Sequence, residues 1–217
     1  STTLTTQNGM SLYRFSVSAN SKGDVGLYKV AVNVATSSTP TGTSSTTVTN
    51  LRLKAYSSSS FTGEVPGFTT SGQLTASSSY LTLRNGGSTD IYGNSSLVTQ
   101  TDLYMDGVSS GQQYLQIPAG ATYYFELLGD ISLTGGPTSG SVVTSLQGDA
   151  AYPIPPVGAS ASRLMYSAVD VDVSPQNDFI WSPNATGTSV TTNVDWTNGY
   201  FLPGLKSDNM DAVTITK

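Results

Sequence analysis

The chain has 217 residues, a net charge of −5 and only 11% charged residues, against roughly 25% in an ordinary soluble domain. Nine basic residues are too few for the Lys/Arg patch that nucleic acid requires, and no apolar run is long enough to cross a bilayer, so neither nucleic-acid binding nor membrane insertion is expected. Because the chain contains no histidine and no cysteine, disulfides, thiolate catalysis and the usual general base near neutral pH are excluded.

The composition favours a location outside the cell. The chain contains 33 serines and 30 threonines, so hydroxyl groups rather than charges keep its surface hydrated. Such a surface suits glycan attachment or close lateral packing of copies. The sequence begins at Ser1 and its first residues lack the basic and then apolar plan of a signal peptide, so we expect a mature exported chain or part of a longer one. The expected location is extracellular, at the cell surface.

The N-terminal part predicts two alternating strands after a polar arm. Residues 1–11 are polar except at two positions, one of them Leu4, and predict a loose arm or a short strand that can exchange between subunits. Residues 12–19 and 25–36 then alternate apolar and polar side chains with period two, as half-buried strands do. The Asn-Ser-Lys-Gly-Asp turn between them predicts a hairpin.

The middle of the chain predicts further short strands. Residues 48–56 form a third alternating segment. Residues 80–83 and 91–92 flank an Arg-Asn-Gly-Gly sequence, whose consecutive glycines predict a hairpin turn. Residues 113–133 predict a strand, a Pro-Ala-Gly corner and a second strand, which suits the edge of a sheet because Pro118 gives up no ladder hydrogen bond there.

The C-terminal part combines a proline-rich crossing with an aromatic-rich segment. Residues 141–147 predict a strand, and residues 148–161 are rich in proline and alanine and predict a crossing between sheets or lobes. Residues 165–174 follow, in which apolar and polar side chains alternate as in a strand. Residues 177–205 contain both tryptophans and several turn sequences, and residues 211–217 (DAVTITK) predict the last strand.

These segments together predict an all-β fold. Roughly ten short strands are separated by Gly, Pro and Ser turns, and no useful length shows helical periodicity. We expect an immunoglobulin-like β-sandwich of antiparallel sheets with Greek-key connections. Its predicted parts are an arm or exchangeable strand (residues 1–11), the sandwich (residues 12–148), and a proline-rich crossing with an aromatic-rich C-terminal β extension packed on the sandwich (residues 149–217).

Five stretches of the sequence resemble a known group of proteins. They are LYRFSVSANSKGDVGLYKVAVNV, VTNLRLKAY, IPAGATYYFELLGDIS, NDFIWSPNATGTS and DWTNGYFLPGL. Over most of residues 12–205 the chain resembles uncharacterised secreted or surface-displayed proteins of ultra-small candidate-phylum bacteria, in which similar stretches lie at the C-terminal end of longer exported chains. The resemblance implies an exported immunoglobulin-like domain, and it implies no particular activity, catalytic residue or ligand.

The sequence offers candidate sites for glycans and for a metal ion. The Asn-X-Ser/Thr triplets at Asn94 and Asn184 could accept N-glycans on exposed loops, although such triplets also arise by chance in a chain so rich in serine and threonine. Asp170 and Asp172 lie two residues apart on one strand face and could share Ca²⁺ with a loop carboxylate. The alternative, which we favour, is a solvated face opposite the neighbouring valines. No other cofactor is expected.

The aromatic residues Trp181, Trp196, Tyr200 and Phe201 have two interpretations. The rings can fill a core or a contact between subunits, which we favour because aromatic side chains bury the most apolar area. They can instead form a flat platform that stacks on the sugar rings of surface glycans. Exposed coplanar rings would distinguish the second interpretation from the first.

The chain ends suggest how copies could join. Leu4, Val213 and Ile215 lie in short terminal strands that could complete the sheet of a neighbouring subunit, or pair within their own chain. Head-to-tail contacts that do not close into a ring produce a filament. We therefore expect a structural protein that polymerises with itself, as a subunit of a cell-surface filament or of a surface layer.

Two other classes of function remain as alternatives. The first is a carbohydrate-binding or adhesion module of a larger surface protein. The second is an enzyme, which we do not expect, because a Ser-His-Asp triad cannot be built without histidine. The chain also has only two glutamates, Glu64 and Glu126, and Glu126 sits in a strand pattern, so a pair of acids for glycoside hydrolysis is not evident.

Overall fold

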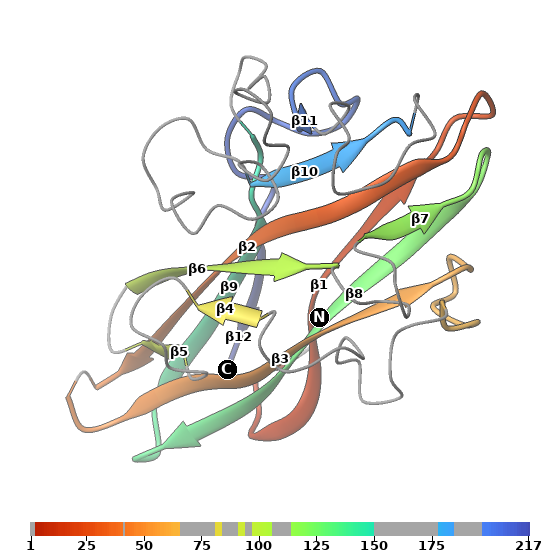
Figure 1. Ribbon diagram of the computed structural model, residues 1–217. Helices are drawn as coiled ribbons and strands as arrows, with labels where there is room; N and C mark the ends of the chain where they lie inside the picture. The colour runs from red at the N-terminus through yellow and green to blue at the C-terminus, as the bar shows by residue number, and fades with distance from the viewer. Residues whose placement is uncertain are drawn as a thin grey trace.

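The computed structural model describes residues 3–40, 42–65, 81–83, 91–93, 97–105, 114–149, 178–184 and 197–217. Regular secondary structure in these ranges consists of twelve β-strands, which pair antiparallel in two sheets (Figure 1). The predicted all-β class is confirmed. Among the described residues there is no helix of the length and apolar character needed to cross a membrane.

The strand boundaries follow the sequence pattern over most of the described residues. In chain order the strands are β1 (Gln7–Ser18), β2 (Val25–Thr39), β3 (Ser45–Tyr56), β4 (Leu81–Leu83), β5 (Ile91–Gly93), β6 (Leu97–Tyr104), β7 (Leu115–Ile117), β8 (Thr122–Thr134), β9 (Ser139–Leu146), β10 (Phe179–Ser182), β11 (Thr197–Asn198) and β12 (Val213–Thr216). Two differences stand out. β1 begins at Gln7, inside the predicted arm, and β6 lies where the sequence pattern predicts no strand.

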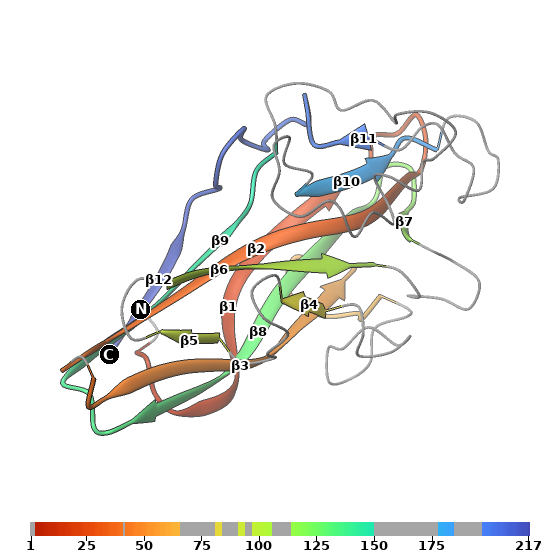
Figure 2. The same cartoon turned by 60° about the vertical axis from the view of Figure 1, so that its left-hand side comes forward.

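The two sheets have different organisation. Sheet A is arranged around the long strand β2, with β7 and β6 along one edge and β10 and β9 along the other. β4, β11 and β12 extend it beyond β6, β10 and β9 respectively. Sheet B has the strand order β1-β8-β3-β5. Figure 2 shows β9 and β12 side by side along one border of sheet A, close to both chain ends.

The sheets pack their apolar faces together. A single cluster of buried side chains includes Val30 and Val32 from sheet A and Leu53 and Phe125 from sheet B. Phe15 of β1 stacks on Phe125 of β8, with ring centroids 4.8 Å apart. Two layers around a common apolar core are consistent with a β-sandwich.

The predicted hairpin between residues 12–19 and 25–36 is wrong. β1 pairs with β8 in sheet B, whereas β2 lies in sheet A. Alternation indicates only that a strand has one buried face, and this fits two neighbours in one sheet and two strands in opposite sheets equally well. The turn of residues 20–24 therefore connects the two sheets.

The predicted hairpin of residues 80–83 and 91–92 is also wrong. β4 pairs with β6 and β5 pairs with β3, so β4 and β5 are not the two arms of a hairpin. Pairing with other strands overrides the local turn signal.

The Pro-Ala-Gly corner leads from β7, whose one partner among the described strands is β2, to β8, which lies between β1 and β3. The corner therefore connects the two sheets.

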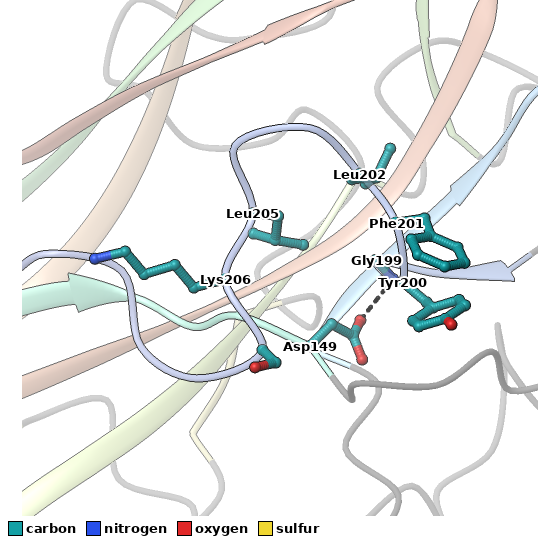
Figure 3. A pocket seen from close by; sticks show the side chains of 8 residues that line it. Asp149, Gly199, Tyr200, Phe201, Leu202, Leu205 and Lys206 are labelled. Atoms are coloured by element: carbon teal, nitrogen blue, oxygen red, sulfur yellow. Dashed lines mark hydrogen bonds between the residues drawn. The ribbon is translucent and has the colours of Figure 1, made fainter.

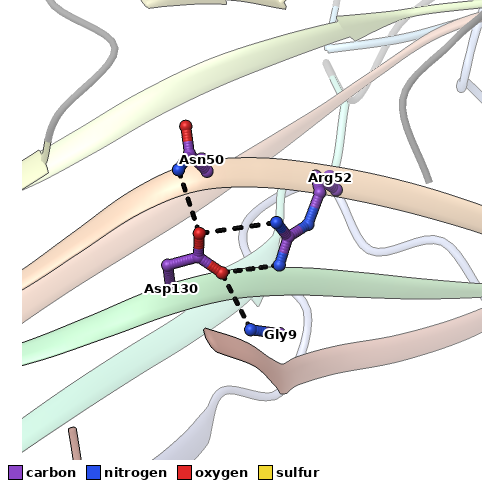
Figure 4. Close-up of polar contacts among 4 residues, drawn as sticks. All are labelled: Gly9, Asn50, Arg52 and Asp130. Atoms are coloured by element: carbon purple, nitrogen blue, oxygen red, sulfur yellow. Dashed lines mark hydrogen bonds and ion pairs between the residues drawn. The ribbon is translucent and has the colours of Figure 1, made fainter. Parts of the chain in front are cut away.

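A polar cluster at Asp130 joins three strands of sheet B (Figure 4). Asp130 lies on β8, between irregularities in β1 near Gly9 and in β3 near Asn50, both of which have left-handed backbone (φ 69° and 50°). The carboxylate accepts hydrogen bonds from the Gly9 N–H at 2.8 Å, the Asn50 amide at 2.9 Å and the Arg52 guanidinium at 2.6 Å. One carboxylate therefore holds both bulges, and with them the register of the sheet.

We expect the protein to lose stability in acid through Asp130. Burial alone would raise the pKa of Asp130, but hydrogen bonds from Asn50, Gly9 and Arg52, together with the charge of Arg52, outweigh burial and hold the pKa below its ordinary value of 3.8. Because the pKa is lower in the folded state than in the unfolded chain, the stabilisation is present above about pH 5 and is lost as the pH falls through the folded-state value. Asp130→Asn should cost about 2 kcal/mol at neutral pH and flatten the acid dependence of urea unfolding. Equal pH dependence in both proteins would contradict this role.

Candidate functional site

Residues 178–184 and 197–217, which we call the C-terminal segment, contribute three strands to sheet A. β10 pairs with β2 on one side and β11 on the other, and β12 pairs with β9. After β11 the chain forms a stretch that we call the C-terminal loop, residues 199–205. The Leu202 N–H donates to the Gly199 carbonyl and the Leu205 N–H donates to the Leu202 carbonyl, both at 3.1 Å, so the loop consists of consecutive turns.

Asp149 anchors the C-terminal loop (Figure 3). It follows β9, its exposed fraction is 2%, and its carboxylate accepts three hydrogen bonds from the C-terminal segment. The donors are the N–H groups of Phe179 at 2.9 Å and Gly199 at 2.8 Å, and the side-chain amide of Asn198 at 3.2 Å. The Asp149 N–H donates to the Lys206 carbonyl at 3.0 Å. A buried carboxylate needs donors of this kind, so Asp149 holds β10, β11 and the loop together.

Two glycines permit the close approach of these segments. At Gly148 a Cβ atom would lie 1.8 Å from the carbonyl oxygen of Asp208 and 2.1 Å from that of Lys206. At Gly199 a Cβ atom would lie 2.2 Å from the side chain of Leu205. A side chain at Gly148 would force the C-terminal segment away from the end of β9, because the atoms it meets belong to the backbone, whereas a side chain at Gly199 would displace the Leu205 side chain.

Phe201 projects into solvent from a strained backbone. Its exposed fraction is 82%, and among the described residues it is the most exposed large hydrophobic side chain. Its φ of 61° lies in the left-handed region, which costs an L-residue about 1–2 kcal/mol. Tyr200 lies beside it, with ring centroids 3.9 Å apart and ring planes inclined by 42° (Figure 3). Sparsely populated backbone of this kind concentrates at binding sites.

A second left-handed phenylalanine, Phe61, is supported by its own chain. Its φ is 56°, close to that of Phe201. Tyr56 and Tyr124 contact its ring edge-on, at centroid distances of 5.7 Å and 6.3 Å, and the Arg14 guanidinium lies 4.2 Å from the ring centroid. These contacts offset the strain at Phe61, whereas Phe201 has one ring neighbour and faces solvent. Phe201 is therefore the candidate for contact with another molecule.

Two hollows flank the C-terminal loop. The first has a volume of about 410 Å³ and is lined by the rings of Tyr200 and Phe201, with Asp149 and Lys206 (Figure 3). The second, which we call the β1 slot, has a volume of about 580 Å³ and lies between the loop and residues 13–18 of β1. The side of the slot opposite β1 includes Leu146, Phe179, Leu202, Leu205 and Met210.

The β1 slot is apolar and electrically balanced. Arg14 is the one charged residue among its described lining residues. The Arg14 guanidinium donates to the Glu126 carboxylate, with the closer nitrogen 2.6 Å from the oxygen. The lining therefore offers no unpaired charge to an ionic ligand and suits an uncharged apolar group.

The structure separates the predicted aromatic residues. Trp181 is half-buried against the core, and its indole N–H donates to the Asn198 carbonyl at 3.0 Å. Tyr200 and Phe201 lie on the surface loop, and Trp196 lies outside the described residues. Because the Tyr200 and Phe201 rings are inclined to each other, they do not form the coplanar platform that would favour a sugar-binding surface.

The predicted terminal residues lie together at one border of sheet A. Leu4 is fully buried and its N–H donates to the Thr216 carbonyl at 2.8 Å. Ile215 is 6% exposed, whereas Val213 is 43% exposed. Leu4 and Ile215 thus pair within their own chain, which is one of the two arrangements that the sequence leaves open.

The other predicted site residues are mostly outside the described part of the chain. Asn94, Asp170 and Asp172 belong to this group. Asn184 is half-buried with a φ of 50°, and its N–H donates to the Ser182 hydroxyl at 3.1 Å. Within the ranges that the structure describes, no three acidic side chains gather in the way that a metal site requires.

The sequence pattern does not indicate a role for Asp149 or Phe61. Asp149 appears in the sequence only as the start of the proline-rich crossing, and no local pattern indicates that its donors come from residues 179–199. The one available signal is a lone acid directly after an apolar strand and a glycine. The left-handed backbone of Phe61 and Phe201 has no sequence signal, because glycine or asparagine usually marks such positions.

The two left-handed phenylalanines should respond differently to substitution. Phe61→Ala should lower the free energy of unfolding by about 1–2 kcal/mol, because it removes ring and cation–π contacts. Phe201→Ala should change it by less than about 0.5 kcal/mol, and Phe201→Gly should be about 1 kcal/mol more stable than Phe201→Ala, because glycine adopts left-handed backbone freely. Urea unfolding of dilute protein measures these differences. Equal losses for Phe61→Ala and Phe201→Ala would contradict the distinction.

Comparison of the sequence with protein-family models and with curated proteins finds no match.

Proposed function

We propose that this protein is an exported structural subunit of a cell-surface filament or surface layer, and that its copies contact one another through the C-terminal loop. The observation that supports this most is Phe201, an exposed aromatic side chain on strained backbone, held in place by the buried Asp149 anchor. Binding energy between proteins concentrates in a few aromatic anchors of this kind. A hydroxyl-rich surface with few charges also favours close packing of copies.

The immunoglobulin-like topology and the extracellular location belong to the same proposal. Their support is the resemblance of residues 12–205 to secreted and surface-displayed proteins, and the low charge and absence of cysteine. The two antiparallel layers are compatible with an immunoglobulin-like arrangement.

Contact between folded subunits is a simpler route to assembly than strand exchange. Exchange of residues 1–11 would take Leu4 out of its buried position and break its hydrogen bond to Thr216. Exchange of β12 would expose Ile215 in the same way. Contact through the C-terminal loop requires no such opening, so strand exchange is a second route that assembly does not need.

The alternative function is a carbohydrate-binding or adhesion module. The hollow beside Tyr200 and Phe201 supports it, because its lining combines two aromatic residues with the polar residues Asp149, Lys206 and Ser207, a mixture that suits a sugar ring and its hydroxyl groups. The inclination of the two rings allows only one of them to lie flat on a given sugar. We therefore place self-assembly first and glycan binding second.

Negative-stain electron microscopy tests the proposed function. We expect the purified protein to form fibres or sheets in some range of salt and calcium concentration. Dispersed particles under all conditions would reject the structural role and favour the binding module. In that event, a change in fluorescence on titration with polysaccharides, lost in Phe201→Ala, would identify the module.

A further inference from the structure

The C-terminal loop carries both a projecting apolar ring and one wall of an apolar slot. Phe201 projects from it, and the next residues, Leu202 to Leu205, line the β1 slot. Among the large hydrophobic side chains whose exposure the structure describes, Phe201 and Val213 are exposed. Phe201 offers an exposed apolar group, and the slot, which is bordered by the same loop, has a lining of suitable chemistry to receive one.

The charge balance of this face indicates what can occupy the slot. Arg14 is paired with Glu126, and Lys206 beside the first hollow is paired with Asp211. An anionic partner finds no unpaired cation among the described lining residues. The chain as a whole carries a net charge of −5, so a second copy approaches with least repulsion through a face whose charges are already paired.

We propose that Phe201 of one copy inserts into the β1 slot of a second copy, while the second copy's Phe201 inserts into the slot of the first. Phe201 directly precedes Leu202, the first of the loop residues that line the slot, so the ring and the slot border the same loop. A two-fold contact requires each copy to present both the ring and the slot to the other copy. The slot volume of about 580 Å³ leaves room for a phenyl ring. The inference rests on the proposed function and specifies the chemistry of one of its contacts.

This contact closes into a pair and does not by itself propagate. A two-fold interface uses the same surface on both partners, so a filament or layer needs a second and different contact. The border of sheet A contains Val213, the other exposed large hydrophobic side chain among the residues whose exposure the structure describes. Pairs formed through Phe201 would then be the unit that polymerises.

The absence of cysteine allows a direct test by disulfide trapping. Copies carrying Phe201→Cys are mixed with copies carrying Val17→Cys, a residue that lines the slot, and oxidised. We expect a cross-linked heterodimer from this mixture and a far lower yield when Val17→Cys is replaced by Ser59→Cys on the exposed loop after β3. No cross-link, or equal yields with Ser59→Cys, would overturn the inference.

A chain carrying both Phe201→Cys and Val17→Cys distinguishes a closed pair from an open array. The two-fold contact predicts that cross-linking stops at the dimer, whereas a ladder of higher species would overturn it. The experiments distinguish failure of the proposed function from failure of the proposed Phe201 contact. Polymers in the microscope without the cross-link would reject this contact and keep the structural function; a cross-linked pair without polymers would keep the contact and reject the filament or layer.

Discussion

Asp149→Ala is expected to destabilise the protein by about 4 kcal/mol and to release the C-terminal loop. The substitution removes the acceptor of three hydrogen bonds, from Phe179, Asn198 and Gly199. Buried donors that lose their acceptor cost about 1–3 kcal/mol each, which makes this one of the largest effects that a single side chain can produce here. Urea unfolding followed by tryptophan fluorescence measures it, because the indole of Trp181 is bonded to the adjacent Asn198 carbonyl.

The control for Asp149→Ala is Asp208→Ala, which removes an acid of the C-terminal segment itself. Asp208 is exposed and its carboxylate accepts a hydrogen bond from the neighbouring Asn209 N–H. We expect this control to change stability by less than about 0.5 kcal/mol. Asp149→Asn should cost less than Asp149→Ala, because the amide oxygen can still accept from the Phe179 and Gly199 N–H groups and only the contact with the Asn198 amide is lost. A loss below about 1 kcal/mol for Asp149→Ala would contradict the anchoring role.

Gly148→Ala is expected to cost at least about 3 kcal/mol or to prevent folding. The new Cβ atom would lie 1.8 Å from the Asp208 carbonyl oxygen, and because that atom belongs to the backbone, the whole segment must move. Gly23→Ala is the matched control, since no atom lies within 4 Å of a Cβ at that position. It should be neutral or slightly stabilising, because alanine restricts the unfolded chain. The thermal unfolding midpoints of the two variants measure this difference. Equal midpoints would show that the C-terminal segment does not pack against Gly148 as described.

The sequence predicts the strands of this protein better than it predicts their pairing. Period-two alternation locates β1, β2, β3 and β8, because each has one face on the core. It does not indicate which strand lies beside which, so the predicted hairpin of residues 12–19 and 25–36 was wrong. β6 was missed because its sequence, LVTQTDLY, lacks regular alternation.

The candidate site was only partly predictable for a related reason. Aromatic composition drew attention to Trp181, Tyr200 and Phe201, but sequence cannot divide such a group between core and solvent. That division depends on Asp149, which lies 50 residues from Gly199 in the chain and is bonded to it at 2.8 Å. The strain at Phe201 depends on a backbone angle that only the folded loop defines.

The two phenylalanines with left-handed backbone, Phe61 and Phe201, differ in the contacts that support their rings. Phe61 shows that this fold can support a ring on strained backbone with its own side chains, Tyr56, Tyr124 and Arg14. Phe201 has the same backbone strain with one ring contact. Phe201 is therefore the position at which we propose that a second copy makes contact.

Whether Phe201 mediates self-association is tested most directly by sedimentation velocity of wild type and Phe201→Ser over a range of concentrations. Wild type is predicted to sediment as increasingly large species as concentration rises. Phe201→Ser is predicted to form smaller species than wild type at every concentration, with an unfolding midpoint no lower than that of dilute wild type. Phe61→Ala serves as the control, because it should lose stability and still associate. Identical association of wild type and Phe201→Ser would contradict the account.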